Sequence, residues 1–263
     1  MARSAGFTIK SVLAISGVLF GLAAGSAMAT TVTTSSVSLP NGNTTVNIVY
    51  PSQSGTLDGG GSNIITGMIG LQTNIGALNT YCVDLFDYIS TGNPSVNTFN
   101  QNALTAGSHF QNGSLTGTFT QAQVNVITKL LTNGSLQSNT VVNNAALQIA
   151  IWAAEYDTAA ANGTYNITAG DAFYFTATGD SNSAAALALA QTYLNNATGY
   201  VNGSGQFVNA TWLTQSNKFV EFLTSTTGNV QDLVYLATPE PSTIAMFGLG
   251  LIGLWATRRR KLI

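Results

Sequence analysis

The chain has 263 residues and carries little charge: eight Lys and Arg, ten Asp and Glu, one His and one Cys give a formal net charge of −2 at pH 7. Only two of the basic residues, Lys129 and Lys218, lie between residues 30 and 237, which argues against nucleic acid or an anionic membrane as a ligand of this part. One Cys and one His cannot by themselves form a disulfide or a zinc site, and we expect no metal and no cofactor.

Residues 1–29 have the features of a secretory signal peptide. Arg3 and Lys10 precede an apolar run at 12–24, and a small-residue site of the kind that signal peptidases read ends at Ala29. The apolar run is too short for a membrane-spanning helix, which needs about 20 apolar residues. We therefore expect cleavage after Ala29 and export of the rest of the chain across the inner membrane.

The first part of the exported chain is predicted to form β-strands. The predicted strands are 46–50, 64–71 and 77–89, which are rich in β-branched and aromatic residues and are separated by Gly, Asn and Pro. Alternation places Cys82, Asp84 and Phe86 on one face of the third strand. Residues 91–118, which include His109, are rich in Asn, Gly and Ser and are predicted to be loop.

Helices are predicted next, at 120–133, from 143 or 144 to 156, and at 183–197. The first opens with the capping box Thr120 to Gln123 and ends at Asn133-Gly134. The second is apolar nearly all round, which predicts that it is buried. Strands are predicted again at 207–213, 219–223 and 230–236. The order predicts an α+β fold, with a helical part inserted into an antiparallel β-sheet or barrel.

The C-terminal tail joins a Pro-Glu-Pro motif, an apolar run at 244–256 and a basic cluster that ends at Lys261. The motif and cluster residues are Pro239, Glu240, Pro241, Arg258, Arg259 and Arg260. A basic cluster after a hydrophobic segment stays cytoplasmic. The tail would therefore hold the exported body at the membrane, as a short transmembrane helix, until it is processed.

The tail closely resembles the PEP-CTERM sorting signal of exopolysaccharide-producing Gram-negative bacteria. This resemblance implies that an exosortase, a membrane-embedded cysteine transpeptidase, is a partner that recognises the Pro-Glu-Pro motif and processes the tail. It also implies a location at the cell surface, in the outer envelope or in the extracellular matrix. The chain is thus divided into a signal peptide (1–29), a body (30–237) and a hydrophobic sorting helix (238–263).

Two short strings stand out from the Thr- and Asn-rich background of the body. One holds Cys82 and Asp84 on a predicted strand, and the other runs from Gln148 to Trp152 on the apolar helix. A thioester forms when a Cys thiolate attacks the side-chain amide of a Gln and ammonia is released. A Gln on an apolar helix fits this chemistry, because a free amide there would need several hydrogen-bond partners.

Two neighbours could support a Cys82–Gln148 thioester. Trp152 lies four residues after Gln148 and hence on the same helix face, where its ring can shield the bond from water. Asp84 shares the predicted strand face of Cys82 and is a candidate for handling protons.

Both strings resemble the thioester domains of surface adhesins of Gram-positive bacteria. In that family a Cys on a strand is cross-linked to a Gln in a Gln-x-Ala-Ile-Trp helix, and the preceding helix commonly ends in Asn-Gly, as at Gly134 here. The chain has Leu147 where family members more often have Thr or Ser, and their stalk and wall-anchoring parts have no counterpart in the sequence. The resemblance implies a covalent binder and not a turnover enzyme. Its Cys82–Gln148 thioester would react with a Lys amine or a hydroxyl of a partner, including exopolysaccharide, in adhesion or biofilm formation.

Two other hypotheses stay open. An inert, buried Cys82 would leave a non-catalytic matrix protein that binds exopolysaccharide through aromatic side chains. Its candidate aromatic residues are Trp152, Tyr156 and Trp212. A Cys82–His109 hydrolase would need an orienting carboxylate, for which Asp84 and Asp87 are candidates. The thioester hypothesis alone requires Cys82 and Gln148 to lie within bonding distance.

Overall fold

The computed structural model of the chain describes most of the body. The described residues are 30–50, 61–85, 87, 89–91, 96–112, 115–134, 137–156, 165–168, 173–198, 219–227 and 230–237. The expected signal peptide, the strand at 207–213 and the sorting tail lie outside them. Within these segments no helix has the length and apolar character that crossing a membrane requires.

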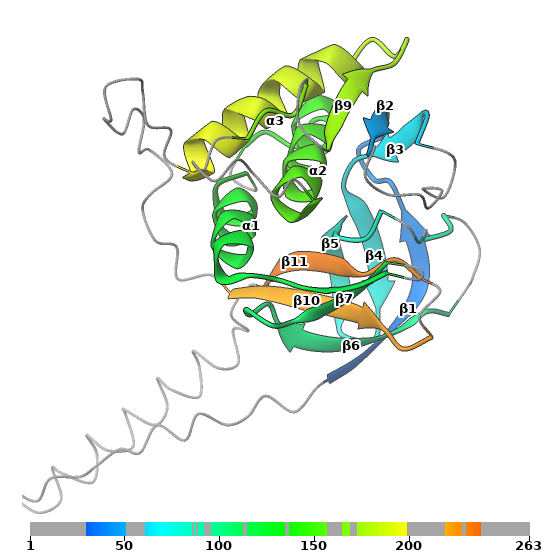
Figure 1. Cartoon of the computed structure of the whole chain (residues 1–263). Coiled ribbons are helices and arrows are strands. Elements are labelled where there is room, and N and C mark those ends of the chain that lie inside the picture. The colour runs from blue at the N-terminus through cyan, green and yellow to red at the C-terminus, as the bar shows by residue number, and fades with distance from the viewer. Residues whose placement is uncertain are drawn as a thin grey trace, which may run out of the picture.

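Six antiparallel strands close into a barrel in the order β1-β4-β5-β11-β10-β6 (Figure 1). They are β1 (Thr30–Ser38), β4 (Ile69–Thr73), β5 (Gly76–Cys82), β6 (Thr98–Ala103), β10 (Phe219–Ser225) and β11 (Leu233–Ala237). Side chains such as Val32, Leu71 and Phe222 are buried and contribute to the core. Closure pairs each of these strands on both sides, so the barrel has no open edge.

Two smaller sheets accompany the barrel. The first has the order β3-β2-β9 and consists of β3 (Ile64–Thr66), β2 (Thr44–Val49) and β9 (Tyr174–Ala177). The second is the pair β7 (His109–Asn112) and β8 (Leu115–Thr118). In Figure 1 the three-stranded sheet lies beside the helices, and it packs against α2 and α3.

Three helices stand together at one end of the barrel (Figure 1). They are α1 (Gln121–Gly134), α2 (Val141–Tyr156) and α3 (Ser183–Thr198). The expected capping box starts α1: Gln123 N donates to Thr120 Oγ1 over 3.3 Å, and Thr120 N donates to Gln123 Oε1 over 2.8 Å. Helix α2 packs against α1, α3 and β5, and it is buried from Asn144 to Tyr156. An apolar surface all round a helix is stable only in such a central position.

The predicted α+β class with a barrel and an inserted helical part is confirmed, and so are the three helices, although α2 begins slightly earlier than expected. The prediction of loop for 91–118 is wrong, because this stretch contains β6, β7 and β8. Strand β6 has an Asn- and Gln-rich sequence with weak β propensity, but it pairs with β1 on one side and β10 on the other. Pairing with distant strands therefore decides its conformation.

Gly134 ends α1 where that helix lies against Leu147 of α2. A Cβ at position 134 would lie 2.7 Å from Leu147 Cδ1, and Leu147 is only 1% exposed, so its side chain has little room to move. We expect Gly134→Ala to lower the free energy of unfolding by about 1–3 kcal/mol, as measured by urea denaturation. Gly179→Ala is the control, because a Cβ there would meet nothing within 4 Å. Equal urea midpoints for the two variants would contradict this packing argument.

Candidate functional site

Gln148 completes the hydrogen bonding of β5 at Cys82, which the neighbouring strand β4 does not reach. The pairing of β4 with β5 begins at Ile69 and Thr80, so Cys82 extends beyond it. The backbone N–H of Cys82 donates to Gln148 Oε1 over 2.8 Å, and Gln148 Nε2 donates to the Cys82 carbonyl oxygen over 2.8 Å. A side chain of α2 thus takes the place of a strand and brings together two residues that are 66 positions apart.

One stripe along α2 holds the end of β5 and the segment that follows it. Its members, spaced four residues apart on one helix face, are Asn144, Gln148, Trp152 and Tyr156. The Tyr81 hydroxyl donates to Asn144 Oδ1 over 3.3 Å. The Tyr156 hydroxyl accepts from Leu85 N and donates to the Val83 carbonyl oxygen, each over 3.3 Å. The stripe therefore fixes the backbone on both sides of Cys82.

Trp152 fills the stripe between Gln148 and Tyr156. Its side chain is 1% exposed, and its Nε1 has no hydrogen-bond partner among the described residues. A buried indole N–H without a partner costs free energy, so packing of the ring must compensate for it. The ring keeps this part of the helix face apolar and dry.

Three carboxyl groups of this region are buried: Asp84 and Glu155 act on the Cys82 thiol, and Asp232 acts on Glu155. Burial raises the pKa of the Cys82 thiol well above its usual value, and negative charge on Asp84 and Glu155 raises it further. The pKa of Glu155 is also raised well above its usual value, first by burial and then by Asp84; the Tyr156 hydroxyl lowers it, and Asp232 raises it. The thiol is consequently held in its neutral form at neutral pH.

Positive charge is scarce around this site. Among the described residues the one Lys or Arg is Lys129, and its Nζ donates to the carbonyl oxygen of Ala197 over 3.1 Å. The buried carboxyl groups are therefore not neutralised by a described Lys or Arg, and after burial, the largest cause, the charge of Asp84 raises the pKa of Glu155 further.

The sequence predicted four site residues in the body: Cys82, Gln148, Asp84 and Trp152. The structure brings them together, but it corrects the position of Asp84. Strand β5 ends at Cys82, so the expectation that Asp84 shares a strand face with Cys82 is wrong. Gln231 Nε2 donates to the Asp84 carbonyl oxygen, and Asp84 Oδ1 accepts from Asp87 N over 3.3 Å. These side-chain bonds and those of Tyr156 replace strand pairing after Cys82. Phe86 lies outside the described residues.

The residues of the two alternative hypotheses lie elsewhere or are buried. His109 is on β7, opposite Thr118, and in the described part of the chain no hydrogen bond joins it to Cys82. Trp152 and Tyr156 are 1% and 7% exposed, so their rings cannot stack on a polysaccharide. Trp212 and the sorting residues Pro239, Glu240, Pro241, Arg258, Arg259 and Arg260 lie outside the described residues.

Three residues of this region were missed by sequence reasoning: Asn144, Glu155 and Asp232. For two of them a signal exists, because Asn144 lies four residues before Gln148 and Glu155 lies seven residues after it in a helix that is otherwise nearly apolar. Asp232 has no comparable signal. It reaches the site because β11 pairs with β5.

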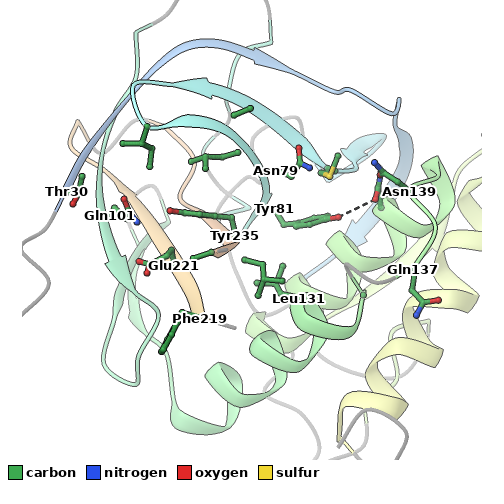
Figure 2. Close-up of a pocket in the computed structure, with 18 residues that line it drawn as sticks. Thr30, Asn79, Tyr81, Gln101, Leu131, Gln137, Asn139, Phe219, Glu221 and Tyr235 are labelled. Atoms are coloured by element: carbon green, nitrogen blue, oxygen red, sulfur yellow. Dashed lines mark hydrogen bonds between the residues drawn. The ribbon is translucent and has the colours of Figure 1, made fainter. Parts of the chain in front are cut away.

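A separate hollow of about 790 Å3 lies beside the Cys82–Gln148 pair. Strands β5, β10 and β11, the end of α1 and Asn144 of α2 contribute to its lining (Figure 2). In Figure 2 the Tyr235 ring lies between Glu221 and Tyr81, and a dashed line marks the hydrogen bond from the Tyr81 hydroxyl to Asn144. Neither Cys82 nor Gln148 lines the hollow.

The known proteins that this chain resembles fall into two groups. Residues 237–261 match the PEP-CTERM protein-sorting motif, and no curated protein matches the sequence. Among solved structures, the chain is similar to the N-terminal domain of the Streptococcus pyogenes pilus tip adhesin Cpa, with 13% identity, coverage of 77% of this chain and 100% of that chain, and a TM-score of 0.40.

Two further structures are N-terminal thioester domains. One belongs to the fibronectin-binding protein SfbI from Streptococcus pyogenes, with 13% identity, coverage of 65% of this chain and 87% of that chain, and a TM-score of 0.39. The other belongs to a surface protein from Clostridium perfringens, with 10% identity, coverage of 74% and 99%, and a TM-score of 0.37. For the protein as a whole, the sorting motif supports export to the cell surface and implies processing by an exosortase.

Glu155 is expected to make the folded state less stable as the pH rises. Its pKa is raised on folding, so the folded protein keeps this proton to a higher pH than the unfolded chain, whose Glu pKa is about 4.3. Below that pH the bound proton makes its full contribution to the free energy of unfolding. This contribution is lost as the pH rises toward the raised pKa. In a Cys82→Ala background, Glu155→Gln should therefore raise the free energy of unfolding by at least about 1 kcal/mol at about pH 8, and by much less at about pH 4.5. Equal effects at the two pH values in urea denaturation would contradict this expectation.

Proposed function

We propose that the protein is an exported surface protein whose body forms an internal Cys82–Gln148 thioester and attaches covalently to a partner. The observation that carries the proposal is the pair of 2.8 Å hydrogen bonds between the Gln148 carboxamide and the backbone of Cys82. They hold the amide carbon beside the residue that bears the single thiol of the chain. The body then reacts once, as a covalent binder and not as a turnover enzyme.

The same hydrogen bonds favour the chemistry of thioester formation. When the sulfur of Cys82 attacks Gln148 Cδ, negative charge develops on Oε1. The Cys82 N–H already donates to Oε1 and therefore stabilises this charge, as an oxyanion hole does. Collapse of the intermediate breaks the bond from Cδ to Nε2, and the nitrogen takes up the proton that the thiol lost and leaves as ammonia. The bond from Sγ to Cδ remains.

Asp84 is the candidate for moving that proton. It is fully buried two residues after Cys82, and its charge acts on the thiol. A carboxylate beside a thiol can accept the thiol proton as a general base. Returning the proton to the leaving nitrogen restores the carboxylate, so the overall reaction converts a thiol and an amide into a thioester and ammonia.

Burial would protect the bond until a partner arrives. Cys82, Gln148 and Trp152 are 5%, 1% and 1% exposed, so little water reaches the acyl carbon. Lys129 is the one Lys among the described residues. Its amine is also held away from the acyl carbon, because Lys129 Nζ is bonded to Ala197.

Reaction with a partner would transfer the Gln148 acyl group. Attack by a Lys amine leaves an amide between Gln148 and the partner and restores the Cys82 thiol. Attack by a hydroxyl leaves an ester, for which exopolysaccharide is a candidate acceptor. This chemistry suits adhesion and biofilm formation at a Gram-negative cell surface, once residues 1–29 are removed and the tail at 238–263 has been released from the membrane by an exosortase.

A non-catalytic matrix protein with an inert Cys82 is the second candidate function. It is favoured by one observation: the two hydrogen bonds to Cys82 also satisfy the buried Gln148 amide without any reaction. In that case the contact would serve only to join α2 to the barrel.

Intact mass distinguishes the two functions. We expect the mature segment to be lighter by one ammonia than the sum of its residues, and methylamine to replace that deficit with one adduct. Cys82→Ala and Gln148→Glu are the controls, since the first removes the nucleophile and the second the leaving nitrogen, and both should show full mass and no adduct. Full mass of the parent, with a thiol that is alkylated after unfolding, would establish the inert Cys82 instead.

A further inference from the structure

We propose that one end of the barrel holds a binding site for an α-ammonium group, and that its occupant is the N-terminus that cleavage after Ala29 creates at Thr30. The site, here called the ammonium seat, is formed by Gln101 of β6, Glu221 of β10 and Tyr235 of β11, which line the hollow. The inference goes beyond the proposed function and holds whether or not a thioester forms. It uses the expected cleavage after Ala29.

Part of the hollow lies at one end of the barrel. Thr30 and Phe219 are the first residues of β1 and β10, Ala237 is the last residue of β11, and all three line the hollow. Further into the barrel, Leu223 of β10 and Leu233 of β11 are fully buried. The interior is therefore filled with apolar side chains below this end, and polar groups are placed only at the mouth.

The strand registers place the seat residues on the inner face of the barrel. Glu221 lies opposite Tyr235, and Gln101 lies opposite Leu223, which is two residues after Glu221 and hence on the same face of β10. Leu223 is fully buried, whereas the two neighbours of Gln101 in β6 are exposed. Since side chains alternate along a strand, the exposed neighbours face solvent and the seat faces the interior.

Thr30 brings the start of the expected mature chain to the seat. It is opposite Gln101 in the pairing of β1 with β6, and opposite residues of antiparallel strands share a face. Figure 2 shows Thr30, Gln101 and Glu221 on one side of the hollow, with the hydroxyl end of Tyr235 directed toward them. The first residue of the mature chain and the seat therefore share one compartment.

The direction of β1 points the Thr30 nitrogen toward Glu221. Strand β6 lies between β1 and β10, and Ala103, two residues after Gln101, is opposite Glu221. Because β1 and β6 are antiparallel, the N-terminal end of β1 is directed toward Ala103 and hence toward the row of Glu221. Strands β1 and β10 are about 10 Å apart across β6, a gap that the Glu221 side chain largely spans.

Gln101 bridges the rest of this gap. It forms a hydrogen bond with the Glu221 carboxyl group, and Nε2 is the donor because a carboxylate only accepts. This leaves Gln101 Oε1 as an acceptor for the ammonium group of Thr30. An ammonium group at this position thus meets one amide oxygen directly and one carboxylate nearby.

The seat is negatively charged and has no cation of its own. Among the described residues that line the hollow, Glu221 is the one charged side chain. The other titratable side chains there are Tyr235 and Tyr81, and Tyr81 leaves the opposite face of the sheet. Burial raises the pKa of Glu221, and the hydrogen bond with Gln101 lowers it. A carboxylate that burial destabilises is stabilised by a positive charge beside it.

Signal-peptide cleavage supplies that charge. Hydrolysis of the peptide bond after Ala29 consumes one water and leaves a carboxylate on Ala29 and an ammonium group on Thr30. Before cleavage the Thr30 nitrogen is a neutral amide, which cannot neutralise Glu221. The mouth of the barrel is therefore completed only in the exported, processed protein.

Reactivity of the α-amine tests the seat. In the exported protein, N-terminal sequencing should give Thr30 as the first residue. At about pH 7 the α-amine should react with the uncharged reagent N-hydroxysuccinimidyl acetate about twofold to fivefold more slowly than an α-amine moved out of the seat, because an ion pair keeps it protonated. The rate is followed by the mass of the N-terminal peptide.

An insertion of Thr-Thr after Ala29 provides the matched α-amine. It keeps the first two residues of the mature chain identical and moves the ammonium group about 7 Å along the strand. Glu221→Gln should bring the parent rate up to that of the insertion and should leave the insertion unchanged. Asp180→Asn is the control, because it removes a carboxylate that does not line the hollow, and its rate should equal that of the parent.

Salt provides a second measurement, should Glu221→Gln fold poorly in circular dichroism. In 1 M NaCl the Debye length is about 3 Å, so the difference between the parent and the insertion should shrink toward zero. A first residue other than Thr30, equal rates for the parent and the insertion, or a difference that persists in Glu221→Gln or in 1 M NaCl would overturn the ammonium seat. None of these results bears on the thioester, which intact mass tests separately.

Discussion

The two hydrogen bonds between Gln148 and the backbone of Cys82 join the helical part of this protein to its barrel. They exist because β4 does not reach Cys82, which leaves an N–H and a carbonyl oxygen of β5 to be satisfied inside the protein. A side-chain amide can satisfy both at once, since it carries one acceptor and one donor group. Tyr156 does the same for the next residues with its hydroxyl. The helix therefore lies where it completes the sheet.

Polar groups are concentrated in this otherwise apolar interface. Asp84 and Glu155 are buried near a thiol, Asp232 is buried near Glu155, and the pKa values of Cys82 and Glu155 are raised. Burial of carboxyl groups with little positive charge nearby lowers stability, so a protein under selection for stability alone would not retain them. Strongly shifted pKa values are typical of reactive sites. This conflict between stability and local chemistry supports the proposal of a reactive site at Cys82.

The proposed thioester depends on keeping water away. Its acyl carbon must be dry until a partner arrives, and the low exposure of Cys82 and Gln148 meets that need. A body with two Lys residues has few amines of its own to compete for the bond.

The sequence alone determined the helices, the α+β class and the sorting motif, because each depends on local spacing or on a short motif. The closeness of Cys82 and Gln148 was predicted from the resemblance of two short strings to thioester domains. Capping at Thr120 and the apolar surface of 143–156 act over a few residues and can be read directly. Only the tertiary structure decided that β6 is a strand, that β5 ends at Cys82 and that Asp232 acts on Glu155. Those three features depend on partners far away in the chain: β1 and β10 for β6, the polar stripe of α2 for β5, and β11 for Asp232. Hydrogen bonds and burial between distant segments form only once the chain has folded, so no local pattern predicts them.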